Sequence, residues 1–241
     1  MLDSQKSSEG ARTTVLWSPV YDALRAAILG HNLTPGTKLP EDEVGEIYSV
    51  SRTVVRSALQ ALAHDRLVQL EPNRGAFVAK PSKQEARDVF EARALIEPKV
   101  AGMAAEIATA ADVKRLRRHL DDEHRAIEQG MDGEAVVLSA QFHIAIAEIA
   151  AQSVLTEFVR TLCSRSSLII SLHWRRHDTF CESHAHHALV DAIAKHSPID
   201  AAELMTSHLV DLLSGLDLRP AEAAERSLAE ILAPVPNKAR A

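Results

Sequence analysis

Three histidines crowd into the segment ESHAHHALVDAI, at positions 184, 186 and 187. Neutral imidazole nitrogens are good ligands for zinc and related ions, and imidazoles also titrate near neutral pH. The cluster could therefore hold a metal ion, respond to pH or simply decorate a helix. If the segment is helical, His186 lies on the apolar stripe of Leu189 and Ile193 and points inward. His184 and His187 fall off this stripe, and we expect them to face solvent or the edge of a bundle.

The composition is that of a folded globular protein, with 46% hydrophobic and 25% charged residues. A chain of 241 residues is long enough for one large domain or two smaller ones. No apolar run approaches the roughly 18 residues of a membrane span, and the opening residues lack the apolar core of a signal peptide. We therefore expect a cytoplasmic protein without membrane contact, in which Cys163 and Cys181 are reduced thiols.

The negative charge is confined to one part of the chain. The formal net charge is −6, yet residues 1–80 carry equal numbers of acidic and basic side chains, so all of it falls on residues 81–241. This excludes a protein that coats nucleic acid by bulk attraction. A nucleic-acid surface is possible only as a local patch in the first third of the chain.

Three helical patterns and a hairpin occupy this first third. The segments SPVYDALRAAILG, PEDEVGEIYSV and SRTVVRSALQAL show helical periodicity, and the last begins with Ser51 as N-cap. Its outer face carries Arg52 and Arg56, with no acidic residue before Leu62 to neutralise them. RLVQLEPNRGAFVAKP follows, which predicts two short strands joined by a turn with a positive φ at Gly75. Three small helices and a basic hairpin predict a winged helix-turn-helix, whose third helix fits the DNA major groove.

The same residues resemble a known family. LTPGTKLPE, SRTVVRSAL and NRGAFV are similar to three motifs of the GntR-type bacterial regulators, and the resemblance covers their whole DNA-binding domain. It implies DNA contacts by Arg52 and Arg56 to bases or phosphates, by Ser51 and Thr53 to the DNA backbone, and by Arg74 and Gly75 of the wing in the minor groove. The alternative for the arginines is a solvated helix face. Ser49 and Arg66 stand where the family usually has glycine.

The second block is helical almost throughout, and it resembles the FCD effector-binding domain in VFEARALIEPKVAGMAAE, AQFHIAIAEIA and HHALVDAIAKHSPIDAAELMTSHL. The fold class expected is therefore mainly α, with a C-terminal antiparallel bundle of six or seven helices. Many FCD domains bind a metal ion, and the resemblance places the ligands at Ser139, His143, His186 and His208. Zinc or nickel suits three imidazoles. Ser139 replaces the usual aspartate, which weakens the site or leaves that position to water.

Three arginines are candidates for binding an organic acid. Arg93 occupies a family position that often faces the cavity, but it also lies one turn before Glu97, with which it can form a surface salt bridge. Arg160 and Arg165 are further candidates. The dense mixed-charge stretch VKRLRRHLDDEHR is interpreted as solvated.

Together these patterns predict a ligand-responsive transcriptional regulator. We expect a homodimer that binds a short inverted repeat of double-stranded DNA and is a repressor released by a small organic acid. The expected organisation is a tail over residues 1–14, the winged domain over 15–80, a linker over 81–86, the effector-binding and dimerisation domain over 87–233, and a tail over 234–241. A metal-free regulator with an acyl-like effector or none remains an alternative, as does a histidine–metal enzyme.

Overall fold

The helix-turn-helix predicted for the first third is present in the computed structural model, which describes residues 17–174 and 182–218. The first helix includes residues 17–29, followed by α2 (Glu41–Tyr48) and α3 (Arg52–His64). Their apolar stripes meet in one core, in which Ile28, Val55 and Leu62 are fully buried. The outer face of α3 is left exposed to solvent, as its sequence pattern requires.

The wing contains one strand more than predicted. Strands β2 (Val68–Glu71) and β3 (Gly75–Val78) form the expected antiparallel hairpin, and Gly75 has the expected positive φ, at 100°. β1 (Lys38–Leu39) pairs with the free edge of β3, so the strand order is β1-β3-β2. The sequence predicted only the two strands of the hairpin, since a strand of two residues such as β1 shows no alternation to detect.

Two residues that replace the usual glycine of the family lie in the left-handed region. Ser49 ends α2 with φ 52°, and Arg66 leads from α3 into β2 with φ 61°. The Cβ atom of any residue other than glycine costs about 1–2 kcal/mol in this conformation. The chain therefore keeps the turns that glycine would favour and carries some strain at both.

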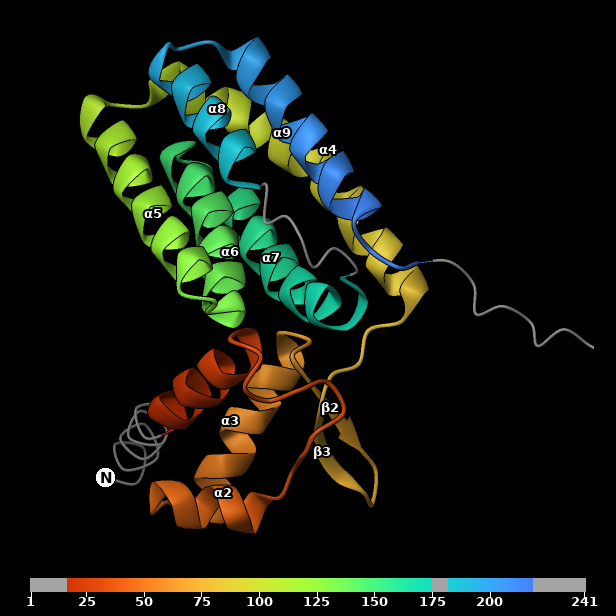
Figure 1. Cartoon of the computed structure of the whole chain (residues 1–241). Coiled ribbons are helices and arrows are strands. Elements are labelled where there is room, and N and C mark those ends of the chain that lie inside the picture. Colours follow the sequence, from red (N-terminus) through yellow and green to blue (C-terminus); the bar gives the residue numbers. More distant parts are fainter. Residues whose placement is uncertain (1–16, 175–181, 219–241) are drawn as a thin grey trace, which may run out of the picture.

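A helical bundle follows and confirms the predicted fold class (Figure 1). The part of the chain that the structure describes contributes six helices to it: α4 (Lys83–Ile107), α5 (Ala110–Glu128), α6 (Asp132–Ile149), α7 (Ser153–His173), α8 (Glu182–Ala194) and α9 (Pro198–Ser214). Their core includes Phe90, Phe142, Ile146 and Leu189. Among the described residues no helix combines the length and apolarity that a membrane crossing requires.

Helix α7 joins the bundle to the winged domain. Leu168 of α7 is part of the apolar core of the winged domain. The Ser167 carbonyl accepts a hydrogen bond from Nε2 of His31 at 3.2 Å, and the Ser164 hydroxyl accepts one from Arg25 at 3.3 Å. Nearby, a Cβ at Gly133 would lie only 2.0 Å from the Gly30 carbonyl oxygen, so this contact of α6 with the first helix requires glycine. The tails expected at 1–14 and 234–241 lie outside the described residues.

Candidate DNA-binding surface and histidine centre

The outer face of α3 presents Arg52 and Arg56, whose side chains are 70% and 62% exposed. Each of these guanidinium groups forms an ion pair with a carboxylate of α2. Arg52 forms a fork with Asp42, and Arg56 donates to Glu41 at 3.1 and 2.9 Å. The hydrogen bonds from Arg56 lower the pKa of Glu41. Our expectation that no acid neutralises this face was therefore wrong, because the acids come from the preceding helix.

The wing tip has the same arrangement. Arg74 pairs with Glu71 and lies over the Phe77 ring at 5.4 Å, while the Lys38 ammonium lies 6.0 Å from the same ring. Lys38 comes from β1, the strand that the sequence did not reveal, and it makes the wing more basic than predicted. Gly75 of the wing is also exposed. Ser51 and Thr53, at the start of α3, are exposed as well, and the Ser51 side chain makes no capping hydrogen bond to the helix.

Three predicted metal ligands come together inside the bundle. His143 of α6, His186 of α8 and His208 of α9 are at most 3% exposed, and one nitrogen from each lies within 4.8 Å of the others. Nε2 of His208 is 3.2 Å from Nε2 of His143 and 3.2 Å from Nε2 of His186. His184 and His187 are exposed, as predicted from the stripe.

Two buried carboxylates that we did not predict orient these rings. Glu97 of α4 lies 2.5 Å from Nδ1 of His143, and Glu123 of α5 lies 3.0 Å from Nδ1 of His186. Burial alone would raise the pKa of Glu97, but the charge of Arg93 and the hydrogen bonds from His143 and Arg93 lower it to about 2, so it is a carboxylate. Nδ1 of His143 must then carry the proton, which leaves the lone pair of its Nε2 directed at His208.

Burial raises the pKa of Glu123 to about 7 despite the nearby histidines. We expected every charge of its segment to be solvated, which was wrong for Glu123 because it continues the buried stripe of Leu116 and Leu120. The position of Glu123 on this apolar stripe was the signal in the sequence that could have predicted its burial. The same applies to Glu97, which shares the inner stripe of α4 with Phe90 and Arg93.

The donor set fits a divalent cation. Burial lowers the pKa of His143 and, further, that of His208, so both stay neutral and able to donate a lone pair at neutral pH. Nitrogens bound at about 2.0–2.1 Å around a tetrahedral zinc lie roughly 3.3 Å apart, close to the two spacings of 3.2 Å. Carboxylates on the outer ring nitrogens are the usual second layer of histidine–metal sites.

The remaining candidates are one serine and three arginines. Ser139 is one turn before His143 and partly exposed. Arg93 pairs with Glu97 at 2.5 Å and donates to the Ser166 hydroxyl at 3.1 Å, so the salt-bridge alternative is present, but buried and not at the surface. Arg160 bonds to Glu148 on the exterior, and Arg165 bonds to Glu85 near the winged domain. The structure does not bring these two arginines to the histidines.

A winged helix-turn-helix with exposed arginines, joined to a helical bundle that encloses a histidine centre, is the architecture of a DNA-binding regulator. Residues 16–78 match the family described as bacterial regulatory proteins, gntR family, and residues 88–211 match the FCD domain. The chain belongs to the GntR family of transcriptional regulators, with a C-terminal FCD domain, and the predicted resemblance is confirmed. Membership in this family makes it a transcription regulator and not an enzyme.

Individual relatives support the assignment over most of the chain. The HTH-type transcriptional repressor RspR of Escherichia coli K12 is 27% identical over 92% of this chain and 87% of its own. The galactonate operon transcriptional repressor of the same strain is 28% identical over 70% of this chain and 82% of its own. The crystal structure of a GntR regulator from Rhodococcus sp. RHA1 superposes with a TM-score of 0.73 at 28% identity, covering 85% of this chain and 96% of that one.

Proposed function

We propose that this regulator is a repressor released by a small organic acid that binds at a divalent metal ion, zinc or nickel, held by His143, His186 and His208. One observation carries the proposal: three buried imidazole nitrogens converge at the spacing of metal ligands, with carboxylates behind two of them. Such an ion supplies open coordination positions for an effector carboxylate. The galactonate in the name of one relative is itself a carboxylate, which supports this ligand class.

On the DNA side, we propose a homodimer that places one winged domain on each half of a short inverted repeat. The winged domain is assigned to residues 15–80, the linker to 81–86 and the effector domain to 87–233. The residues proposed to contact DNA are Ser51, Arg52, Thr53, Arg56, Arg74 and Gly75. An arginine fork on guanine is worth about 1–3 kcal/mol of base discrimination, whereas a phosphate contact only positions the protein.

The buried ion pair suggests how the effector centre acts on the DNA-binding domain. Glu97 links His143 to Arg93, and Arg93 bonds to Ser166 of α7. The next residue of α7, Ser167, accepts a hydrogen bond from His31 of the winged domain. Any shift of the His143 ring can therefore change the position of α7 through a short chain of charge-assisted bonds. In this arrangement Arg93 positions Glu97 and is a candidate for the effector carboxylate. Ser139 is a further candidate ligand of the metal ion, and Arg160 and Arg165 are outer candidates for the effector.

The metal hypothesis is tested on protein purified without a His-tag and stripped by a chelator. Adding zinc or nickel is expected to raise the melting temperature of the wild type, since an ion stabilises the state that it binds. His186→Ala should abolish the rise. His184→Ala is the matched control, because His184 lies on the same helix but is exposed. Equal responses of both variants would favour the metal-free alternative with an acyl-like effector or none.

The DNA assignment is tested by gel retardation of DNA fragments from the promoter next to the gene of this protein. Arg52→Ala and Arg56→Ala are each expected to abolish specific retardation, while Arg118→Ala, an exposed arginine of α5, should bind as the wild type does. The organic acids that raise the melting temperature only with metal present are then added to the complex. Release of the operator supports repression relieved by effector, and tighter binding would reverse the proposed sign.

A further inference from the structure

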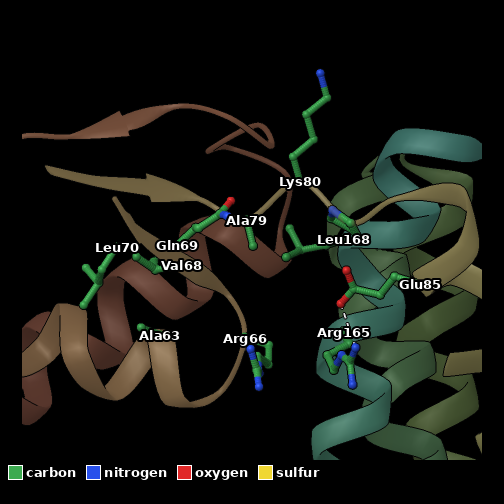
Figure 2. Close-up of a pocket in the computed structure, with 11 residues that line it drawn as sticks. Ala63, Arg66, Val68, Gln69, Leu70, Ala79, Lys80, Glu85, Arg165 and Leu168 are labelled. Carbon is green, nitrogen blue, oxygen red and sulfur yellow. Dashed lines mark hydrogen bonds and ion pairs between the residues drawn. The ribbon is translucent and has the colours of Figure 1, made fainter. Parts of the chain in front are cut away.

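A pocket lies at the junction of the two domains and shares no lining residue with the histidine centre. Its volume is about 360 Å³, enough for a small ligand. The winged domain contributes the turn between α3 and β2, and the bundle contributes the start of α4 and one face of α7. Figure 2 shows Arg66 on one side of the gap and Arg165, bonded to Glu85, on the other.

The charge balance of this pocket favours an anion. Arg165 donates from Nη2 to Glu85 at 2.6 Å, but its Nε is buried and has no hydrogen-bond partner within the described residues. A buried donor without an acceptor is destabilising, so an acceptor placed there is favoured. The Glu85 carboxylate balances the charge of the Arg165 guanidinium, so the second guanidinium at this pocket has no counter-charge. Lys80 also lines the pocket, although its ammonium points away from the gap in Figure 2.

The uncompensated guanidinium is that of Arg66. It makes no hydrogen bond or ion pair with any residue of the ranges 17–174 and 182–218, and it is exposed at the edge of the pocket. Its backbone holds the left-handed conformation, with φ 61°, that disfavours any residue with a side chain. Arg66 is thus an unpaired cation at a strained backbone position beside a pocket, which indicates that its charge has a role.

We propose that this junction pocket is a second ligand site, for a small oxyanion with carboxylate or phosphate chemistry, held between Arg66 and Arg165. The ligand would accept a hydrogen bond from Nε of Arg165 while Glu85 keeps its bond to Nη2, and it would neutralise the guanidinium of Arg66. Because the two arginines belong to different domains, a bound anion bridges them. It therefore favours the domain arrangement in which they face each other, independently of the histidine centre.

Thermal unfolding of the full, chelator-stripped chain tests the proposal, with inorganic phosphate and succinate as probes and sodium chloride at equal ionic strength as reference. Both the Arg165→Gln and Arg66→Gly variants are expected to lose about 10- to 100-fold in apparent affinity for the anion, the loss typical of a hydrogen bond to a charged group. Arg118→Gln is the control, since it removes an exposed arginine of α5 that does not line the pocket. Its response should equal that of the wild type.

Arg66→Gly is chosen because it relieves the left-handed strain, so a lost response in that variant is not a folding defect. The stronger of the two probes identifies the carboxylate or the phosphate class. His208→Ala should keep the full response, which separates this site from the histidine centre. The proposal is overturned if neither anion raises the melting temperature above the chloride reference, or if both arginine variants respond as the wild type does.

Discussion

Replacing Glu97 by Gln should damage both stability and metal binding. The side chains of Arg93 and Glu97 are 3% and 2% exposed, so inside the bundle the Glu97 carboxylate, and not water, provides a counter-charge to the guanidinium. Glutamine is nearly isosteric but neutral, and it removes this counter-charge from the buried arginine. Breaking a buried pair in this way costs about 3–5 kcal/mol. We expect a loss of this size in the unfolding free energy of the metal-free protein.

Glu123→Gln provides a matched comparison. Glu123 is equally buried and holds the same atom of another histidine, but its pKa is raised to about 7, so close to neutral pH it is already protonated in part. A neutral amide therefore removes little net charge, and the unfolding free energy should change by no more than about 1 kcal/mol. Loss of a carboxylate behind a metal ligand typically weakens metal binding about 10- to 100-fold, and we expect this for both variants.

Two measurements separate these effects. Urea unfolding of the chelator-stripped proteins gives the stability difference, and competition with a chromophoric chelator gives the zinc affinity. A stability loss below about 1 kcal/mol in Glu97→Gln would refute the role of this carboxylate as the counter-charge of Arg93. Unchanged zinc affinity in both variants would refute the assignment of the histidines as metal ligands.

Three further predictions concern charge, pH and strain. Asp42→Asn removes the carboxylate paired with Arg52, so binding to random DNA should tighten. The plot of the logarithm of the binding constant against the logarithm of the salt concentration should steepen by about one. A slope equal to that of the wild type, or to that of the control Asp211→Asn, would contradict this. The metal-free protein should lose stability as the pH falls from 6.5 to 5, because the unfolded chain gains protons on His31, His143 and His208, whose folded pKa values are lowered. Glu123, whose folded pKa is raised, opposes them, and a net of at least about one proton corresponds to at least ~1.4 kcal/mol per pH unit in urea titrations; a flat profile is the contrary result. Ser49→Gly should raise the unfolding free energy by about 1 kcal/mol through relief of its left-handed φ, whereas Ser49→Ala should bring no such gain.

Local patterns were sufficient for most of the architecture. The stripe of α3, the hairpin and the long helices of the bundle are properties of contiguous segments, and each was predicted from its own residues. The inward direction of His186 followed from the same reasoning, since a helix fixes which residues share a face. β1 was missed because two residues acquire their strand geometry only from the pairing with β3.

The partners of the charged residues could not be predicted in this way, because they come from other helices. Arg52 and Arg56 lie 10 and 15 positions from the acids that bind them, a separation that only the packing of α2 on α3 explains. Likewise, Glu97 and His143 are 46 positions apart, and Glu123 and His186 are 63 apart. Sequence periodicity places such groups on an inner face but does not say what faces them.

The pairing of the arginines on α3 changes how DNA recognition is expected to work. In the free protein, the guanidinium groups are already oriented by carboxylates, so they lose little side-chain freedom on meeting a base. DNA phosphates cannot approach them without also approaching Asp42 and Glu41, whose negative charge opposes nonspecific binding. A guanine edge, in contrast, offers acceptors without a formal charge. On the proposed assignment of Arg52 and Arg56 as DNA contacts, the acids of α2 are expected to reduce affinity for DNA in general and to favour sites at which these arginines reach bases.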